Sequence, residues 1–194
     1  MSSGFSQTLP EELIERAKLG DRSAFEQIYC TYAKACYNLA YRVCQQPALA
    51  QDIVQDCFVK LMQKIGQYKG EGYFSGWLRR IVANETINRV RKQNRLTLVG
   101  DDESGMLDSA VTVFDSRWVL SEDRLTELLG KLSLNARAVL WLHEVEGYSH
   151  QEIAEMFGKS ESFSKVTLSR AYSQLRKMFD QLPQALERDN NASK

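Results

Sequence analysis

The sequence predicts an all-α protein in which two small helical domains are joined by a flexible acidic linker. Apolar residues recur at spacings of three and four along most of the chain, as in amphipathic helices. Helix capping and stop signals separate these segments, and an aperiodic acidic stretch divides the chain beyond its middle. With 194 residues, 43% of them apolar, the chain is long enough for two cores. We expect domains at 1–96 and 121–194 and a linker at 97–120.

Overall composition limits the possible functions. Basic and acidic residues number 25 each, so binding to nucleic acid would require charge that is segregated along the chain. The N-terminus lacks an export-type basic and apolar run, and the longest apolar string, 138–142, is too short to cross a bilayer. We therefore expect a cytoplasmic protein without membrane insertion. The four cysteines, at 30, 36, 44 and 57, have no C-x-x-C spacing, which favours reduced core thiols over a metal, cofactor or redox role.

Three helices are predicted in the first third of the chain. Residues 8–19 begin with Pro10 and two acids and stop at Gly20, residues 25–43 end before Pro47, and the third helix covers 48–65. Asp52 and Asp56 lie four residues apart on the polar side of the third helix, where like charges cost a few tenths of a kcal/mol. An acidic docking face for a basic partner is one interpretation, and an ordinary solvated face is the more common one.

The stretch from 68 to 95 is the strongest candidate for a functional site. A loop punctuated by glycines and rich in aromatic residues leads into a helical segment, and seven basic residues outnumber two acidic ones between Lys69 and Arg95. At about 100° per residue, one side of this helix carries Trp77, Arg80, Asn84, Asn88, Arg91 and Arg95. Guanidinium groups, amides and rings suit a polyanion with exposed bases. The alternative interpretation is that the aromatic rings belong to the core and the arginines form an ordinary solvated face.

The acidic stretch that follows is interpreted as a linker. Eight acidic and two basic residues lie between Gly100 and Glu127, and 101–116 shows no sustained period. A solubilising spacer is favoured over a segment that imitates nucleic acid.

The last third predicts a helix-turn-helix. Two helices at 121–132 and 133–146 end at Gly147, a capping box from Ser149 to Glu152 opens a short helix that breaks at Gly158, and Ser160 or Ser162 caps a long final helix. Residues 165–177 contain four basic residues and no acidic one. This cationic outer face favours insertion into a DNA major groove over a generic helical hairpin.

Together these motifs resemble the extracytoplasmic-function sigma factors, small bacterial sigma factors that keep only the second and fourth sigma domains. The most specific run is 50–58, Ala-Gln-Asp-Ile-Val-Gln-Asp-Cys-Phe, which is similar to the family's Ala-Glu-Asp-Leu-Val-Gln-Glu-x-Phe. Phe74, Trp77, Asn84 and Arg91 follow at the expected distance, and 146–149, 152–154 and Gly158 fit the fourth domain.

The resemblance implies three sets of site residues. The third helix would dock on a coiled coil of the largest polymerase subunit through Asp52, Gln55, Asp56 and Phe58. The loop would capture a base flipped from the minus-ten element, and the following helix would bind the strand beside it, through Tyr68, Lys69, Tyr73, Phe74, Trp77, Arg80, Asn84, Asn88 and Arg91. The helix-turn-helix would read the minus-thirty-five element through Ser164, Lys165, Thr167, Arg170, Ser173 and Lys177. Expected partners are core RNA polymerase, promoter DNA and an anti-sigma factor.

One departure from the family concerns the recognition helix. Residues 162–167 read Ser-Phe-Ser-Lys-Val-Thr where the family usually shows Gly-Thr-Val-Lys-Ser-Arg, so a basic residue is lost and a ring is added. Phe163 either contacts a thymine methyl group or packs locally. The alternative function is a sigma-like decoy that sequesters an anti-sigma factor without starting transcription. No pairing of a nucleophile with a base is evident in the sequence, so an enzyme is not expected.

Overall fold

The computed structural model describes residues 4–70, 72–97 and 122–180, except for the side chains of 93–97, 122 and 180. The helices are α1 (Glu11–Lys18), α2 (Arg22–Cys44), α3 (Pro47–Lys64), the 3-10 helix η1 (Ile65–Gln67), α4 (Phe74–Thr97), α5 (Glu122–Gly130), α6 (Leu134–Glu144), α7 (His150–Phe157) and α8 (Glu161–Asp180). These ranges contain no strand, and the predicted all-α class is confirmed. The predicted linker, apart from Thr97, lies outside the described residues.

Local signals explain where the first helices begin. Asp21 caps α2 by accepting hydrogen bonds from the main-chain N–H groups of Ser23 and Ala24 at 2.8 and 3.2 Å. Pro47 occupies the first turn of α3, where its missing N–H has no cost. Helix α1 begins at Glu11 rather than at the predicted Thr8, because Pro10 is extended and precedes the first turn.

Helix α4 begins at Phe74, three residues before Trp77, the first residue of the polar side that the sequence predicted for this helix. Its first turn is held by the carbonyl of Tyr73, which accepts hydrogen bonds from the N–H groups of Gly76 and Trp77 at 2.9 and 3.2 Å. Phe74 and Ser75 are both buried, so packing stabilises a turn that the glycine in the sequence disfavours.

The helix-turn-helix forms as predicted from α7 and α8. Ser149 accepts a hydrogen bond from the main-chain N–H of Glu152 at 3.2 Å, and the Glu152 carboxylate accepts one from the N–H of Ser149 at 2.9 Å, which completes the capping box. Gly158 ends α7 with a φ of +60°, a conformation that glycine adopts without strain.

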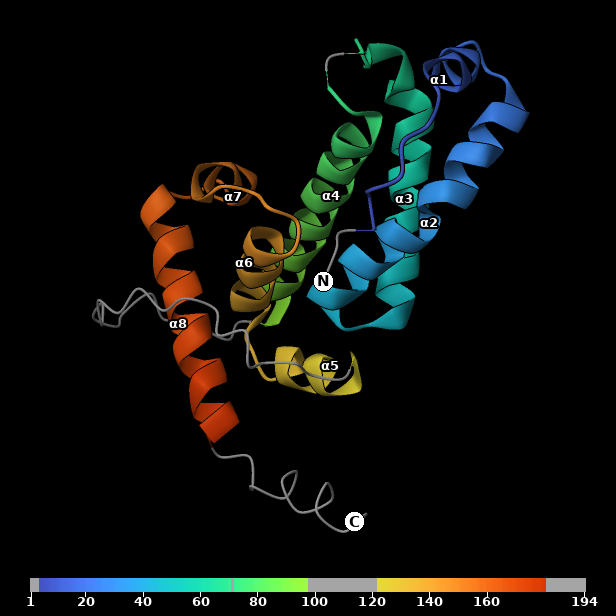
Figure 1. The fold of residues 1–194 in the computed structure, drawn as a ribbon. Helices are drawn as coiled ribbons and strands as arrows, with labels where there is room; N and C mark the ends of the chain where they lie inside the picture. Colours follow the sequence, from blue (N-terminus) through green and yellow to red (C-terminus); the bar gives the residue numbers. More distant parts are fainter. Residues whose placement is uncertain (1–3, 71, 98–121, 181–194) are drawn as a thin grey trace, which may run out of the picture.

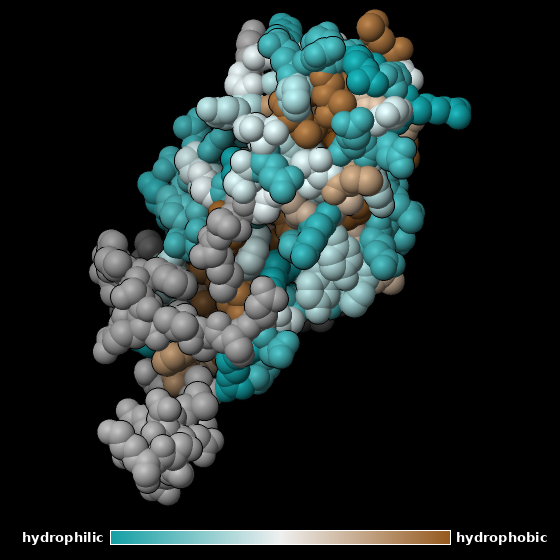
Figure 2. Space-filling model, turned by 45° about the vertical axis from the view of Figure 1, so that its right-hand side comes forward, coloured by the Kyte–Doolittle hydropathy of each residue, from teal (hydrophilic) through white to brown (hydrophobic). Residues whose placement is uncertain are grey.

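The helices form two groups that touch each other. In Figure 1, α2, α3 and α4 lie side by side with α1 at one end, and α6 lies against α2 and α4. The first group buries Ile28, Tyr32 and Ile53, and the second buries Leu142 and Ile153. Each such side chain contributes about 1.5–3 kcal/mol when it leaves water. The face in Figure 2 is mostly hydrophilic, with apolar groups gathered at the end where α1 lies.

Three of the four cysteines are core thiols. Cys36, Cys44 and Cys57 are buried, and burial raises the pKa of Cys57 to about 12 and that of Cys36 still further, so both remain protonated. The expectation of a core position was wrong for Cys30, which is exposed on α2. Because α2 packs on its neighbours along one side, position 30 faces solvent.

Candidate nucleic-acid and polymerase interfaces

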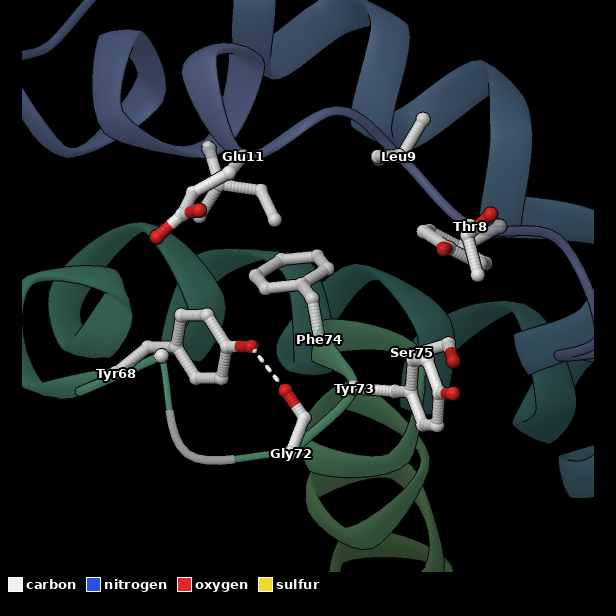
Figure 3. Close-up of a pocket in the computed structure, with 11 residues that line it drawn as sticks. Thr8, Leu9, Glu11, Tyr68, Gly72, Tyr73, Phe74 and Ser75 are labelled. Carbon is white, nitrogen blue, oxygen red and sulfur yellow. Dashed lines mark hydrogen bonds between the residues drawn. The ribbon is translucent and has the colours of Figure 1, made fainter.

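The loop that precedes α4, the N-terminal segment and helices α1 and α2 line a partly open pocket of about 190 Å³. Figure 3 shows Thr8, Leu9 and Glu11 on one side of it and Tyr68, Tyr73 and Phe74 on the other. The Tyr68 hydroxyl donates a hydrogen bond to the carbonyl of Gly72 at 2.6 Å, which ties the two ends of the loop together. Gly70 and Gly72 have φ values of +78° and +79°, so the bend requires residues without a Cβ atom.

The aromatic residues of this region have different environments. Tyr68 and Phe74 are only 8% and 4% exposed, and their rings lie 5.4 Å apart. Trp77 is half-buried, with its ring 5.5 Å from Tyr68 and 5.8 Å from Phe74. Tyr73, in contrast, is 77% exposed. The ordinary core interpretation therefore holds for Tyr68 and Phe74, whereas Tyr73 and the open part of Trp77 can stack on an extruded base.

The polar side of α4 continues from this loop toward α7. Lys69, Arg80 and Asn88 are exposed, and Asn84 and Arg91 are half-buried. Arg80, Asn84, Asn88 and Arg91 thus follow one side of α4, as the helical spacing predicted, whereas the side chain of Arg95, also predicted on this face, lies outside the described residues. This face borders the second group of helices, because Arg80 lies 3.9 Å from Glu155 and the Arg91 guanidinium lies beside Gly158.

Arg79 has a structural role that the sequence reasoning missed. Its guanidinium lies 5.0 Å above the ring of Tyr148 and donates a hydrogen bond to the carbonyl of Glu146. Burial, the largest effect, raises the pKa of Tyr148 to about 12 although Arg79 opposes the shift. The sequence contained a signal for this different role, because the helical spacing places Arg79 outside the polar face of α4 that begins at Trp77.

On α3, Asp52 and Gln55 are exposed, as a docking face requires. Asp56 forms an ion pair with Arg89 of α4, and this hydrogen bond is the main cause of the raised pKa of Arg89. The repulsion expected between Asp52 and Asp56 is therefore partly relieved.

Phe58, which was predicted to face the polymerase, is 5% exposed. Its ring packs against Tyr29 at 4.7 Å and Phe25 at 6.3 Å, because position 58 falls on the side of α3 that meets α2. Phe58 therefore supports the docking face from within the fold. Val59 and Met62 are exposed and extend that face. The sequence contained a signal for this, because both apolar residues lie outside the apolar stripe of α3.

The outer face of α8 carries most of its predicted residues. Lys165, Ser173 and Lys177 are exposed, and Thr167 and Arg170 are half-buried. Lys165 also pairs with Glu161 one turn earlier, at 2.7 Å.

Two residues near the start of α8 pack inside the domain and do not lie on the outer face that would contact DNA. Ser164 is fully buried and shares a hydrogen bond of 3.0 Å with Nδ1 of His150, so it lies on the inner side of the helix. Phe163 packs on Phe157 with the ring centroids 5.3 Å apart, in agreement with local packing rather than a contact with thymine.

Within the described ranges, no cluster of three or more His, Cys, Asp or Glu residues could hold a metal ion. None of the helices in the described part of the chain has the length and apolar character that crossing a bilayer requires.

Comparison with known proteins assigns both halves of the chain. The model of Sigma-70 region 2 matches residues 28–96, and a model of Sigma-70 region 4 matches 122–175. RNA polymerase sigma factor YlaC of Bacillus subtilis is 32% identical over 80% of this chain and 92% of its own length. The ECF RNA polymerase sigma factor SigW of the same species is 29% identical over 87% of this chain and 96% of its own.

The fold is also similar to solved structures. CnrH, in its complex with the cytosolic domain of CnrY, aligns with a TM-score of 0.53 and 25% identity, over 87% of this chain and 96% of CnrH. The agreement of family models, full-length relatives and fold confirms what the order of motifs predicted: the chain belongs to the sigma-70 family, in its extracytoplasmic-function group.

Proposed function

We propose that this protein is an RNA polymerase sigma factor that binds core polymerase, recognises promoter DNA and promotes strand opening. The observation that carries the proposal is the exposed ring of Tyr73 beside a pocket, next to the cationic and amide face of α4. The functional units are the domains at 1–96 and 121–194, joined by the linker at 97–120. The chemistry is binding rather than covalent catalysis.

Strand opening follows from capture of an unstacked base. Separating one duplex step costs about 1–2 kcal/mol of stacking, and a base stacked on an aromatic ring returns about 1–3 kcal/mol. One or two captured bases therefore shift the equilibrium toward the open state without nucleotide hydrolysis. Lys69, Arg80 and Arg91 add phosphate contacts, so binding weakens steeply with salt.

The polymerase docks on α3. Exposed Asp52 and Gln55 supply the acidic and polar part of the surface, and Val59 and Met62 supply an apolar part. A coiled coil with basic residues is the partner that this combination fits.

The second domain reads the minus-thirty-five element with the outer face of α8, where Lys165, Thr167, Arg170, Ser173 and Lys177 lie. Two elements about 25 base pairs apart are separated by about 85 Å of duplex at 3.4 Å per base pair. In the structure α7 touches α4, so the two domains must move apart before both elements are bound.

A cytosolic regulator is a further partner in this proposal. CnrH was solved in complex with the cytosolic domain of another protein, and the face between α4 and α7 is charged on both sides, with Arg80 opposite Glu155. An anti-sigma factor that engages both domains would hold them in the inactive arrangement.

Run-off transcription with core polymerase on a genomic library tests the proposal. A sigma factor yields transcripts that start at shared promoter motifs only when this protein is added. A decoy that only sequesters an anti-sigma factor yields no such transcript, and that outcome would refute the proposed function.

A further inference from the structure

A network of four charged side chains connects α3 and α4, which lie side by side (Figure 1). Lys60 of α3 pairs with Glu85 of α4, and Arg89 of α4 pairs with Asp56 of α3. Arg89 also belongs to the first pair, because its Nε lies 3.5 Å from a carboxylate oxygen of Glu85. Two acidic and two basic side chains therefore cancel each other's charge at this seam.

Glu85 is the anchor of the network. Its side chain is only 10% exposed, and a buried carboxylate is costly unless cations compensate it. Arg89 is consequently held from the inner side by Glu85, while another N–H of the same planar guanidinium binds Asp56. Asp56 is 42% exposed, so its carboxylate is accessible to a partner that approaches α3 from solvent.

The ion pair with Arg89 has a consequence for the docking face on α3. Asp56 lies one turn after exposed Asp52, and a coiled coil with basic residues binds best to carboxylates whose charge is not already neutralised. We infer that Arg89 competes with the polymerase for the Asp56 carboxylate and lowers the docking affinity, so that docking exchanges an internal ion pair for an external one. This inference rests on the proposed function and assigns Arg89, on the neighbouring helix, a role in setting the strength of polymerase binding.

A purely structural bridge between α3 and α4 is the simpler explanation of Arg89, and it predicts the opposite effect of a substitution. If Arg89 only holds the helices together, its loss loosens α3 and weakens docking. If it competes for Asp56, its loss frees a carboxylate and strengthens docking. Loss of any cation from α4 also makes the surface more acidic, and Lys92, exposed three residues after Arg89, controls for that general effect.

The experiment measures the affinity of the full-length protein for core polymerase by titration of the fluorescently labelled protein. We expect Arg89→Gln to bind about threefold more tightly than wild type, as the loss of one partly exposed competing pair suggests. Lys92→Gln should bind like wild type. In a double-mutant cycle, Arg89→Gln should bring no gain in an Asp56→Asn background, because the contested carboxylate is then absent.

Unchanged or weaker binding by Arg89→Gln, with the helix content of wild type by circular dichroism, would overturn the inference and leave the proposed function intact. An equal gain in Lys92→Gln, or a gain that persists in the Asp56→Asn background, would also overturn it, since the effect would then not pass through Asp56.

Arg89→Met, which keeps an unbranched aliphatic stem without the charge, is judged by the same criteria if Arg89→Gln loses helix content. Loss of helix content in both variants would overturn the inference, because Arg89 would then be required for the fold itself. If the wild type does not bind core polymerase, the proposed function fails first and the inference fails with it.

Discussion

The Arg79 guanidinium donates a hydrogen bond to the main-chain carbonyl of Glu146 at 2.7 Å, across 67 positions of sequence and between the two domains. It covers the ring of Tyr148 at the same time. Arg42 makes a second link, because it donates to the Thr126 hydroxyl and lies 5.7 Å from the ring of Trp141. The closed arrangement therefore depends on specific contacts between the domains.

Replacing Arg79 with alanine should loosen this arrangement. The change removes a charge-assisted hydrogen bond and a cation–π contact, so we expect a loss of about 1–3 kcal/mol in the free energy of domain closure and a larger radius of gyration by small-angle X-ray scattering. Arg80→Ala is the matched control, because its exposed pair with Glu155, at 3.9 Å, is worth about 0–1 kcal/mol. Identical scattering from Arg79→Ala and wild type would contradict the prediction.

Tyr73→Ala should impair strand opening more than duplex binding. Tyr73 is exposed, so its loss costs little folding stability but removes a stacking surface worth about 1–3 kcal/mol per base. Permanganate footprinting should show about a tenfold loss of open complex, while gel shifts with duplex promoter change less. Leu19→Ala, an 89% exposed apolar residue at the end of α1, is the control and should affect neither assay.

Trp77→Ala and Arg80→Ala should give the same pattern of losses. Trp77 is half-buried against Tyr68 and Phe74, so its substitution must be accompanied by a stability measurement. Equal losses in the footprinting and gel-shift assays would show that neither residue has a specific role in strand opening.

The sequence predicted the helices and the polar face of α4 because both follow from local spacing. Asp21, Ser149 and Gly158 are capping residues with local effects, and each acts as its residue type suggests. The burial of individual aromatic residues was not predictable from the sequence. Tyr68 and Tyr73 belong to the same loop, and Tyr68 is the buried one because Lys18 of α1 and the rings of Phe74 and Trp77 pack around it. The same holds for Phe58 and Ser164, which are buried by partners distant in sequence, Phe25 and His150.

Lys165→Ala should weaken promoter binding by about 1–3 kcal/mol at the minus-thirty-five element without affecting the fold. Lys165 is exposed, and its pair with Glu161 is a surface contact between residues four apart on α8. Lys131 forms an equivalent pair with Glu127 at 2.8 Å, so Lys131→Ala reproduces the lost pair and the lost charge outside the proposed interface. Gel shifts on the mapped promoter should show weaker binding by Lys165→Ala than by Lys131→Ala. Equal binding by both variants would show that Lys165 does not contribute to promoter binding.

The stability of the helix-turn-helix should decrease on acidification because of His150. Its ring stacks on that of His143 with centroids 4.4 Å apart, and its pKa is lowered by burial first, then by His143 and Lys165, although Glu161 and Glu144 oppose the shift. The unfolded chain, with a histidine pKa of about 6.5, therefore binds the proton more readily than the folded protein.

The contribution of His150 to stability is consequently complete above about pH 6.5 and falls as the pH drops below that value toward the lower pKa of the folded state. Urea unfolding at pH 7.5 and 5.5 should show a decrease in midpoint that is smaller in His150→Gln, in which the proton-binding group is absent. The carboxylates of Glu152 and Glu161 have lowered pKa values and titrate at more acidic pH, so they contribute equally to both proteins over this range. The same decrease in midpoint in both proteins would show that His150 is not the titrating group.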